Sequence, residues 1–422
     1  MIIDGEDRFV MTVIMAAGKG TRMNSNKSKL VHKIYGKELV KRVAEVAKEI
    51  GSDEIVTVVG YLKEQIEEVL GDSVKYAYQE ELLGTGHAMM QAAKYLENKK
   101  GKVVILYGDV PIIRKETLEN LITKSIKNKE YATLLTAMYE NPTGYGRIIR
   151  DEGGNIKAIV EEKDANMFER EIKEINSGIY CFDIEELLAA IKLLKPNNSG
   201  GEYYLTDVIR IMNEKGLKTG AVIVEDNTEI LGVNDRAQLE LLTRVLRMKI
   251  NAEHMRRGVT IEDSNSSYIY DNVIIGKDTI IHPNTTIQSG VIIGENCEIG
   301  PNAFIRENCI IGNDVKIGNS VEVKNVVIGN RSKVPHFTYL GDCEVGEDTN
   351  IGCGTITCNY DGKNKNRTII GSRAFIGCNT NLVAPVVIGN DTLIGAGSTI
   401  TEDVPDGKMA IARERQVIKD KK

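Results

Sequence analysis

Apolar residues recur at every sixth position through much of the second half of this chain. The first run consists of Ile275, Ile281, Ile287, Ile293, Ile299, Ile305, Ile311, Ile317 and Val323, and the register slips at Ile328 and returns from Ile370 to Ile400. A small or β-branched residue lies four positions after each aliphatic of the first run, and a glycine follows many of them. A fixed period of six is typical of a β-helix in which each hexad supplies one strand and one corner. We therefore predict a β-helix whose aliphatics point inward and whose glycines permit the tight turns.

The first half shows a different pattern, in which apolar runs alternate with helical spacing. The expected strands are 11–15, 55–59, 103–106, 132–137 and 177–182, and the expected helices are 62–70 and 118–126. Alternating strands and helices predict a doubly wound, Rossmann-like α/β domain with a parallel sheet. Ligands bind such sheets at the carboxyl ends of the strands. The segments Ala16–Met23 and Tyr107–Asp109 fall at two of these ends.

Helical spacing from Arg236 to Arg257 predicts one long helix between the two halves. With 422 residues, the chain exceeds what a single hydrophobic core usually serves. We therefore predict an α/β domain over 1–234, a linker helix over 235–257 and a β-helix domain over 258–422.

Charge and cysteine content narrow the class of protein. The chain has 54 basic and 60 acidic residues, a net charge of −6, which argues against a nucleic-acid partner. Its seven cysteines form no CxxC pair, and Cys297 and Cys309 occupy the inward small position of their hexads, so we interpret them as apolar filler rather than metal ligands or disulfides. No run approaches the length of a membrane span, and no signal-like segment is evident. We expect a reduced, cytoplasmic, soluble protein without a membrane partner.

A glycine-rich turn follows the first expected strand. In Gly18-Lys19-Gly20-Thr21-Arg22 the glycines let backbone N–H groups approach phosphate oxygens, and Arg22 adds a fork of donors. The turn matches neither the P-loop nor the GxGxxG pattern, so alone it is equally compatible with an ordinary turn. A second compact turn, Gly84–His87, opens a helix, where free N–H groups favour anions.

Asp109, at a strand end, is a candidate Mg²⁺ ligand, although a turn or helix cap is the alternative interpretation. Magnesium typically takes one or two protein ligands and completes its shell with substrate phosphates. Asn234, in Gly232-Val233-Asn234, is the second candidate.

Several motifs appear in an order that resembles a known family. They are Met15–Met23, Lys29, Gln79, Gly84-Thr85, Tyr107–Pro111, Thr143–Arg147, Glu161, Asn176 and Gly232–Asn234. The first half resembles the sugar-phosphate nucleotidyltransferases. Together with the hexapeptide half, it closely resembles the bacterial bifunctional N-acetylglucosamine-1-phosphate uridylyltransferase/glucosamine-1-phosphate N-acetyltransferases, and the resemblance covers nearly the whole chain.

The resemblance implies roles for residues of the first half. Nucleotide binding falls to Met15, Ala16, Ala17, Gly18, Lys29, Gln79, Gly84, Thr85, Tyr107, Gly108 and Asp109. Arg22 and Lys29 are implied as catalytic cations that neutralise the triphosphate. The sugar phosphate is held by Gly146, Glu161, Asn176 and Asn234, and Mg²⁺ by Asp109 and Asn234. Ser28 precedes Lys29 where the family usually has proline, so we expect a less rigid loop there.

In the second half the polar segment Thr357–Arg367 interrupts the hexads, and insertions in repeat proteins often mark the binding face. The resemblance makes His336 the general base that deprotonates the amino group of glucosamine 1-phosphate, a task that suits an imidazole. It implies sugar-phosphate binding by Arg306, Lys324, Tyr339 and Asn350, and acetyl-CoA binding by Cys353, Asn359, Tyr360, Cys378, Ala396 and Arg413. We assign no catalytic role to His32, His87, His254 or His282.

The same resemblance implies a left-handed β-helix, a homotrimer, and synthesis of UDP-N-acetylglucosamine from acetyl-CoA, UTP and the two sugar phosphates. Cys353 and Cys378 stand where alanine and serine are usual, and the early β-helix is shorter than usual. One alternative is a sugar-1-phosphate nucleotidyltransferase of single activity whose β-helix only oligomerises. Another is a regulatory or scaffold subunit, against which the intact Arg22, Lys29, Asp109 and Asn234 argue.

Overall fold

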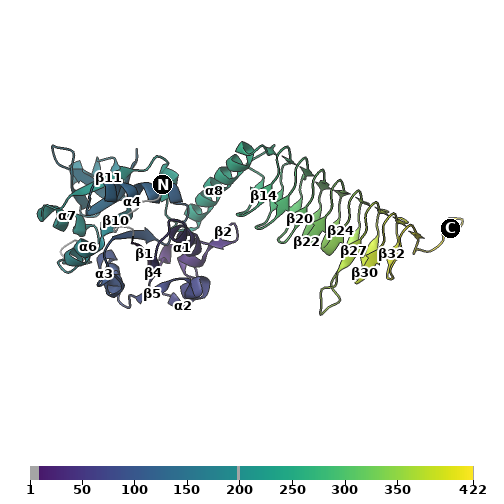
Figure 1. The fold of residues 1–422 in the computed structure, drawn as a ribbon, viewed down its shortest axis with the longest axis horizontal. Coiled ribbons are helices and arrows are strands. Elements are labelled where there is room, and N and C mark those ends of the chain that lie inside the picture. Colours follow the sequence, from purple (N-terminus) through teal and green to yellow (C-terminus); the bar gives the residue numbers. More distant parts are fainter. Residues whose placement is uncertain (1–8, 197–199, 422) are drawn as a thin grey trace. The chain divides into compact units, whose positions relative to one another are not determined.

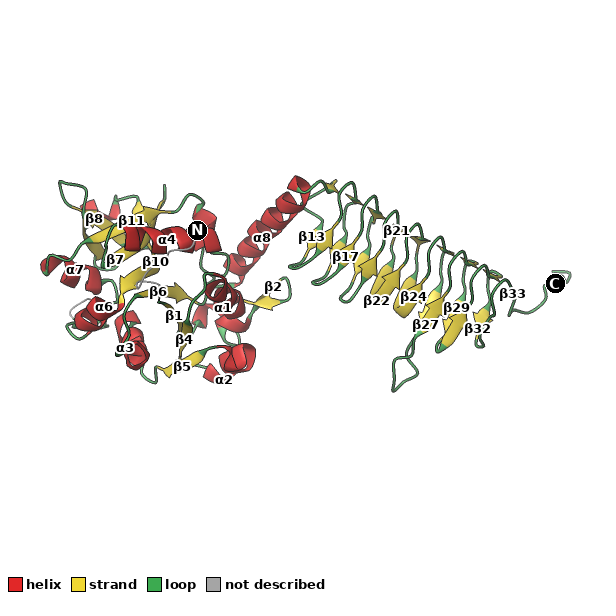
Figure 2. Cartoon of the chain, viewed as in Figure 1, coloured by secondary structure: helices red, strands yellow, loops and turns green. Residues whose placement is uncertain are grey.

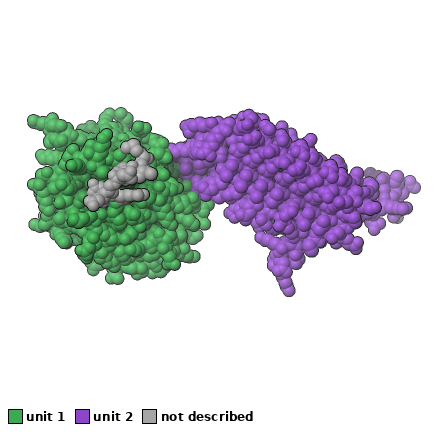
Figure 3. Space-filling model, viewed as in Figure 1, with its two compact units in different colours: residues 1–242 green, residues 243–422 purple. Residues whose placement is uncertain are grey.

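The computed structural model describes residues 9–196 and 200–421. The chain divides into two compact units, residues 1–242 and 243–422 (Figure 3). The division falls inside helix α8, Arg236–Arg256, which matches the long helix expected from the sequence within one residue. The domain limits predicted from the sequence stay a prediction.

Unit 1 contains a mixed sheet flanked by helices (Figures 1 and 2). Its main path runs in the order β11-β7-β10-β6-β1-β4-β5. The strands are β1 Val10–Ala16, β4 Glu54–Val59, β5 Lys75–Tyr78, β6 Lys102–Tyr107, β7 Ala132–Met138, β10 Glu174–Asp183 and β11 Thr219–Ile223. The expected parallel sheet is wrong at β10, which runs antiparallel to both β6 and β7. A further hairpin, β8 Arg147–Arg150 and β9 Ile156–Val160, joins the edge of β10.

Side chains of the central strand β1 alternate between two cores, as expected for a strand that is covered on both faces. Met11, Val13 and Met15 belong to one core, whereas Ile14 and Ala16 belong to the other. The first core also contains buried residues of α3 Thr85–Leu96, α6 Ile184–Ile191 and α7 Asp207–Glu214. The second contains those of α1 Leu39–Glu49, α2 Lys63–Leu70 and α4 Lys115–Lys127. The doubly wound architecture is therefore confirmed.

Unit 2 is a stack of coils whose short strands pair in parallel with the coil before and after (Figure 1). One nine-stranded sheet runs in chain order through β12, β15, β18, β21, β23, β25, β28, β31 and β33. These strands are Thr260–Ile261, Ile280–Ile281, Glu298–Ile299, Lys316–Asn319, Lys333–His336, Asn350–Ile351, Phe375–Ile376, Leu393–Ile394 and Met409–Ala410. A second sheet of thirteen strands contains the remaining strands of the coils. The recurring aliphatics, together with Cys297 and Cys309, are buried in one continuous core. The predicted β-helix is confirmed, and the two cysteines are apolar filler.

Most of the corner glycines serve a purpose other than the predicted one, and Gly300, with a φ of 99°, is an exception. The residues with left-handed φ at the corners are mostly Asn and Asp, such as Asp278 at 62° and Asn296 at 55°. Gly276 and Gly294 are not in that region, but a Cβ on Gly276 would lie 2.6 Å from the carbonyl oxygen of Gly294 in the next coil. These glycines therefore permit the close approach of neighbouring coils, while Asn and Asp, which tolerate αL, make the turns.

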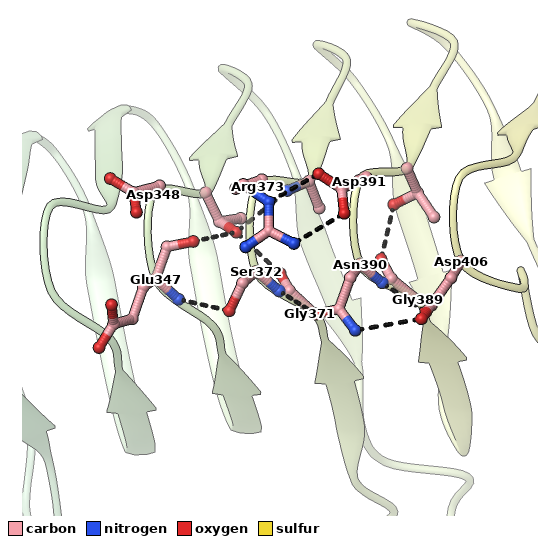
Figure 4. A network of polar contacts seen from close by, with 12 residues as sticks. Glu347, Asp348, Gly371, Ser372, Arg373, Gly389, Asn390, Asp391 and Asp406 are labelled. Carbon is pink, nitrogen blue, oxygen red and sulfur yellow. Dashed lines mark hydrogen bonds and ion pairs between the residues drawn. The ribbon is translucent and has the colours of Figure 1, made fainter.

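Corner side chains also bind the backbone of the preceding coil (Figure 4). Glu347 N donates to Ser372 Oγ at 3.1 Å, Ser372 N to Asn390 Oδ1 at 2.8 Å, and Asn390 N to Asp406 Oδ1 at 2.7 Å. This ladder satisfies backbone N–H groups that the corner would otherwise leave without a partner inside the protein.

In the described part of the chain, no helix is both long and apolar enough to cross a membrane.

The fold predicts unequal effects for two neighbouring residues of β31, Leu393–Ile394. Ile394 is fully buried, whereas Leu393 is 40% exposed. We expect Ile394→Ala to lower the free energy of unfolding of the β-helix by about 2–5 kcal/mol, because it leaves a cavity between coils. Leu393→Ala should cost about 1 kcal/mol or less. Hydrogen exchange of β-helix amides in the full chain measures both; equal losses would contradict the inward orientation of Ile394.

Candidate functional sites

A cavity of about 540 Å³ in unit 1 lies at the carboxyl ends of β1 and β6. Of the residues assigned from the resemblance, those that line it are Met15, Ala16, Ala17, Gly18, Lys29, Gln79, Gly84, Thr85, Tyr107, Asp109 and Glu161. These residues come from six separate segments, so the fold gathers what is scattered in the sequence. Their individual roles stay predictions.

The glycine-rich turn leaves β1 and bends at Gly20, which has a left-handed φ of 60°. A Cβ on Gly20 would lie 2.7 Å from Cβ of Lys29, so only glycine lets the Lys29 side chain pass toward the cavity. Arg22 lies on the short 3-10 helix Thr21–Met23 with an exposed side chain, and it is not among the residues that line the cavity. The catalytic role of Arg22 therefore stays a prediction.

The ammonium group of Lys29 lies between the two candidate magnesium ligands. Lys29 Nζ is 2.5 Å from Asp109 Oδ2 and 3.3 Å from Asn234 Oδ1. The backbone joins the same two segments, because Val233 N donates to Asp109 O at 2.9 Å. Two hard oxygen donors thus converge on one cationic atom, and carboxylate and amide oxygens are the donors that Mg²⁺ prefers. The donor set fits one Mg²⁺ whose remaining ligands come from substrate phosphates and water.

Within the described residues, no group of three or more His, Cys, Asp and Glu side chains could hold a metal ion. A site built from one carboxylate and one amide agrees with the magnesium sites in which phosphates complete the shell.

Gln79 is buried and fixed in orientation at the cavity wall. Its Nε2 donates to Gly84 O at 3.1 Å and lies 3.1 Å from His87 Nδ1. His87, to which we assign no catalytic role, therefore positions Gln79. Gly84 has a φ of 104°, and a Cβ there would lie 2.5 Å from Tyr203 O, so the turn that opens α3 requires glycine.

Glu161, Gly146 and Asn176 lie next to one another, as the sugar-phosphate assignment requires. A Cβ on Gly146 would be 3.4 Å from Glu161 Oε2 and 3.6 Å from Cβ of Asn176. Thr206 Oγ1 donates to Glu161 Oε1 at 3.2 Å, and burial raises the pKa of the Glu161 carboxyl above its ordinary value. Asn176 is part of β10, at a bulge in its pairing with β7, and its Nδ2 donates to Tyr180 OH at 2.6 Å.

One contact near the cavity was missed from the sequence. The Arg147 side chain is almost fully buried and donates from Nη2 to Glu162 Oε2 at 2.7 Å. The same oxygen accepts Gly144 N at 3.2 Å, so this pair fixes the loop that carries Gly144 and Gly146. The sequence contained a signal for Arg147, because it is the last residue of the Thr143–Arg147 motif. Only Gly146 of that motif was assigned a role.

In unit 2, strand register brings the predicted phosphate-binding cations together. The pairs Ile305↔Val323 and Val323↔Leu340 place Arg306, Lys324 and Gly341 at equivalent positions in successive coils. The Lys324 amino group lies beside that of Lys365 in the polar loop, and this contact, burial and the charge of Lys365 lower the pKa of Lys324. Two adjacent amino groups favour an anion between them. Lys365 is a candidate site residue that the sequence analysis did not single out.

Tyr339 and Asn359 meet above Gly341, which belongs to β24 Tyr339–Val345. A Cβ on Gly341 would lie 2.9 Å from Asn359 Nδ2 and would also overlap the Tyr339 hydroxyl. Asn359 Nδ2 donates to Asp342 Oδ2 at 2.5 Å. Burial raises the pKa of Asp342, but hydrogen bonds from Asn325 and Asn359 and the charges of nearby lysines outweigh it and hold that pKa below its ordinary value. Asp342 is thus an anionic anchor for Asn359.

The interrupting loop is shorter than expected. Thr357 and Cys358 belong to β26, Ile356–Cys358, and Thr357 is buried, so the loop outside the strands is 359–367. Predicting Thr357 and Cys358 as loop residues was wrong, because Thr357 Oγ1 accepts Gly341 N at 2.8 Å and continues the coil.

His336 ends β23, Lys333–His336, and its side chain is exposed. Backbone register places it opposite Asn319 of the previous coil, while Lys333 on the same strand pairs with Asn350. An exposed imidazole can exchange protons with solvent, which a general base requires between turnovers.

The residues assigned to acetyl-CoA occupy successive coils. Asn379 N donates to Cys353 O at 2.7 Å, and Gly397 N donates to Cys378 O at 2.8 Å. Arg413 Nη1 donates to Ala396 O at 2.6 Å. Cys378 is exposed and Cys353 partly buried, and both are free thiols. Tyr360 is 63% exposed on the loop. Together, these residues place backbone and polar side-chain groups at successive levels of the β-helix.

Comparison with known proteins agrees with both halves. Residues 11–235 match the family described as nucleotidyl transferase, and residues 290–325 and 367–402 match the bacterial transferase hexapeptide (six repeats). The chain is 49% identical to the bifunctional protein GlmU of Acetivibrio thermocellus, over 97% of this chain and 96% of that protein. It is 51% identical to its counterpart in Caldanaerobacter subterraneus subsp. tengcongensis, over 97% of each chain. With Clostridioides difficile GlmU the identity is 48%, over 97% of this chain and 96% of the relative. The chain therefore belongs to the GlmU family of bifunctional proteins, which confirms the family that its motifs predicted.

Proposed function

We propose that this chain makes UDP-N-acetylglucosamine in two reactions, one in each unit. In the β-helix, acetyl-CoA acetylates glucosamine 1-phosphate; in the α/β unit, the N-acetylated product receives a uridylyl group from UTP. The observation that carries the proposal is the convergence of Asp109 and Asn234 on the Lys29 ammonium group, with Lys29 and Asp109 lining the cavity at the strand ends. The relatives' description as bifunctional supports two activities over a nucleotidyltransferase of single activity.

In uridylyl transfer, a phosphate oxygen of N-acetylglucosamine 1-phosphate attacks the α-phosphorus of UTP. The bond to the β-phosphate breaks, and pyrophosphate leaves with the electron pair. The nucleophile is already anionic, so no general base is needed, and the barrier lies in bringing anions together. Lys29 supplies positive charge at the cavity, while Arg22 neutralises the outer phosphates. Half-buried Glu161 and buried Asn176 orient the sugar, so that attack occurs from a fixed position.

Mg²⁺, when bound by Asp109 and Asn234, supplies further positive charge for the phosphates. Asp109 carries the negative charge that attracts the ion, and Asn234 adds a neutral oxygen. The backbone bond between Val233 and Asp109 holds the two ligands at a fixed separation. Gln79 and the Gly84–Thr85 turn hold the nucleotide.

In acetyl transfer, His336 accepts a proton from the amino group of glucosamine 1-phosphate as nitrogen attacks the thioester carbonyl. The carbon–sulfur bond then breaks, and coenzyme A leaves as the thiol after it gains a proton. Arg306, Lys324 and Lys365 bind the sugar phosphate, with Tyr339 and Asn350 beside them. The residues that hold acetyl-CoA are Cys353, Asn359, Tyr360, Cys378, Ala396 and Arg413.

We further propose that the enzyme is a cytoplasmic homotrimer built on the β-helix. An exposed apolar column supports this: Ile274, Ile292, Ile310 and Val327 pair along one face, and after Glu344 it continues with Ile369 and Val387. Each of these aliphatics is at least 40% exposed in the single chain. Contiguous apolar surface of this kind marks interaction sites, and closed threefold symmetry would cover it.

Asp109→Ala tests the first site. We expect pyrophosphate release in the presence of UTP, Mg²⁺ and N-acetylglucosamine 1-phosphate to fall by at least about a hundredfold, because a carboxylate ligand is lost. Acetylation of glucosamine 1-phosphate should stay near the wild-type rate, and thiol release from acetyl-CoA measures it. Loss of both activities together would refute independent sites.

His336→Ala provides the converse test. Removing a general base typically lowers the rate about 10²–10⁴-fold, so we expect thiol release from acetyl-CoA to drop within that range. Pyrophosphate release should be unchanged. If the wild-type protein itself releases no thiol, the nucleotidyltransferase of single activity is the correct description.

Ile310→Glu tests the assembly. Wild-type protein should sediment at three times the 46.6 kDa mass of the chain. A charge within the apolar column should shift the population to smaller species, because it would be buried without a partner. Lys333→Glu, on another sheet of the β-helix, is the control and should leave the mass unchanged. A wild-type monomer would overturn the trimer.

A further inference from the structure

Glu229 is a fully buried carboxylate to which neither reaction assigns a role. It belongs to the 3-10 helix Asn227–Ile230, and its side chain has no exposed surface. Oε1 accepts Arg114 Nε at 2.6 Å and lies 2.5 Å from Arg114 Nη2. Oε2 accepts Thr117 Oγ1 at 2.6 Å and the backbone N–H of Arg114 at 3.1 Å. Both carboxylate oxygens are therefore fully engaged by one short segment of chain.

That segment is the start of helix α4. Arg114 is the N-cap residue of α4 and makes no side-chain cap, so Glu229 provides the cap from a distant part of the chain. A carboxylate at this end of a helix also interacts favourably with its dipole. The hydrogen bond to Glu229 raises the pKa of Arg114. The Arg114 side chain is half exposed, whereas Glu229 is fully buried, so breaking the pair from the arginine side would leave a buried carboxylate without its partner.

The pair also joins the two segments that carry the proposed Mg²⁺ ligands. Arg114 follows Asp109 by five residues, and Glu229 precedes Asn234 by five. Near the ligands themselves, Val233 N donates to Asp109 O at 2.9 Å. The 109–114 and 229–234 segments are thus tied at both ends, and the ligand oxygens lie at one of those ends.

We infer that Glu229 is a positioning residue for the uridylyl-transfer metal site: it sets the separation of Asp109 and Asn234 by holding the 109–114 and 229–234 segments together. This inference rests on the proposed uridylyl transfer. Groups behind metal ligands commonly change metal affinity about 10–100-fold when they are replaced. Glu229 touches neither ligand, so we expect the lower end of that range.

Glu229→Gln is the main variant, because it keeps the size of the side chain but turns an NH₂ group toward Arg114 and Thr117, which are donors. Thr117→Val is a milder variant that removes one hydrogen bond and preserves shape. Glu130→Gln is the matched control: Glu130 is also buried, and its carboxylate accepts Thr133 Oγ1 at 2.7 Å and Asn128 Nδ2 at 3.0 Å. It lies just before β7, at the opposite end of the strand from the cavity edge of the parallel sheet.

The measurement is Mn²⁺ binding by electron paramagnetic resonance, with UTP present and the sugar phosphate omitted so that no turnover occurs. We expect Glu229→Gln to raise the Mn²⁺ dissociation constant about tenfold and Thr117→Val about two- to threefold. Glu130→Gln should leave it unchanged, even where its thermal unfolding shifts as much as that of Glu229→Gln. Steady-state kinetics should show a higher Mg²⁺ requirement with little change in rate at saturating Mg²⁺, and acetyl transfer should be unaffected.

A purely stabilising role would lower the unfolding temperature of Glu229→Gln and Thr117→Val while their Mn²⁺ affinity stays that of the wild type, and this result would overturn the inference. Equal loss of Mn²⁺ affinity in Glu130→Gln would overturn it as well. Failure of the proposed function is a separate outcome, because wild-type protein would then release no pyrophosphate from UTP and N-acetylglucosamine 1-phosphate.

Discussion

The ammonium group of Lys29 lies between the Asp109 carboxylate and the Asn234 amide oxygen, and this contact joins three segments that are far apart in the sequence. Parallel strands create the opportunity, because β1 and β6 end side by side and direct their loops to one edge. The charges of the side chains at that edge then determine which ligands it can bind. One carboxylate and one lysine give neighbouring binding positions to a cation and to phosphate anions, which is what transfer between two phosphates requires.

The β-helix achieves its site by a different constraint. Coils stack so closely that Cβ atoms are excluded at positions such as Gly276, and side chains therefore form fixed columns along the unit. Arg306 and Lys324 fall in one column without any dedicated scaffold, because equivalent positions in successive coils point the same way. Gly341 completes that column with no side chain, and the space is filled by Tyr339 and Asn359. One glycine in the repeat thus lets polar side chains of neighbouring coils meet.

Features that depend on local pattern could be predicted from the sequence, and features that depend on long-range contacts could not. The hexads fixed the position of inward aliphatics such as Ile317, because period and burial are directly linked. The antiparallel direction of β10 was invisible, since a buried strand has the same composition in either direction. Lys365 was also missed, because a lysine in a polar loop looks solvated until the fold brings it to Lys324.

Buried polar partners form another group that pattern analysis overlooks. Glu229 reads as an ordinary surface residue in Asn227-Thr-Glu-Ile, and its importance depends on Arg114, which lies 115 positions earlier in the chain. The same holds for Arg147 and Glu162. The motifs mark the groups assigned to substrate binding, whereas the contacts that hold those groups in place depend on the fold, so that only the structure identifies them.

Ser28 shows how a departure from the family pattern can be compensated. The expectation was a less rigid loop before Lys29, because proline restricts the backbone and serine does not. In the structure Ser28 is almost fully buried, its N–H donates to Gln65 Oε1 at 2.8 Å, and its hydroxyl accepts Leu30 N at 3.4 Å as the cap of the 3-10 helix Lys29–Val31. Proline has no N–H and could not make the bond to Gln65. Hydrogen bonds of Ser28 therefore hold Lys29 in place, where the family pattern relies on a proline ring. The position of the lysine is restricted in both cases, although by different chemistry.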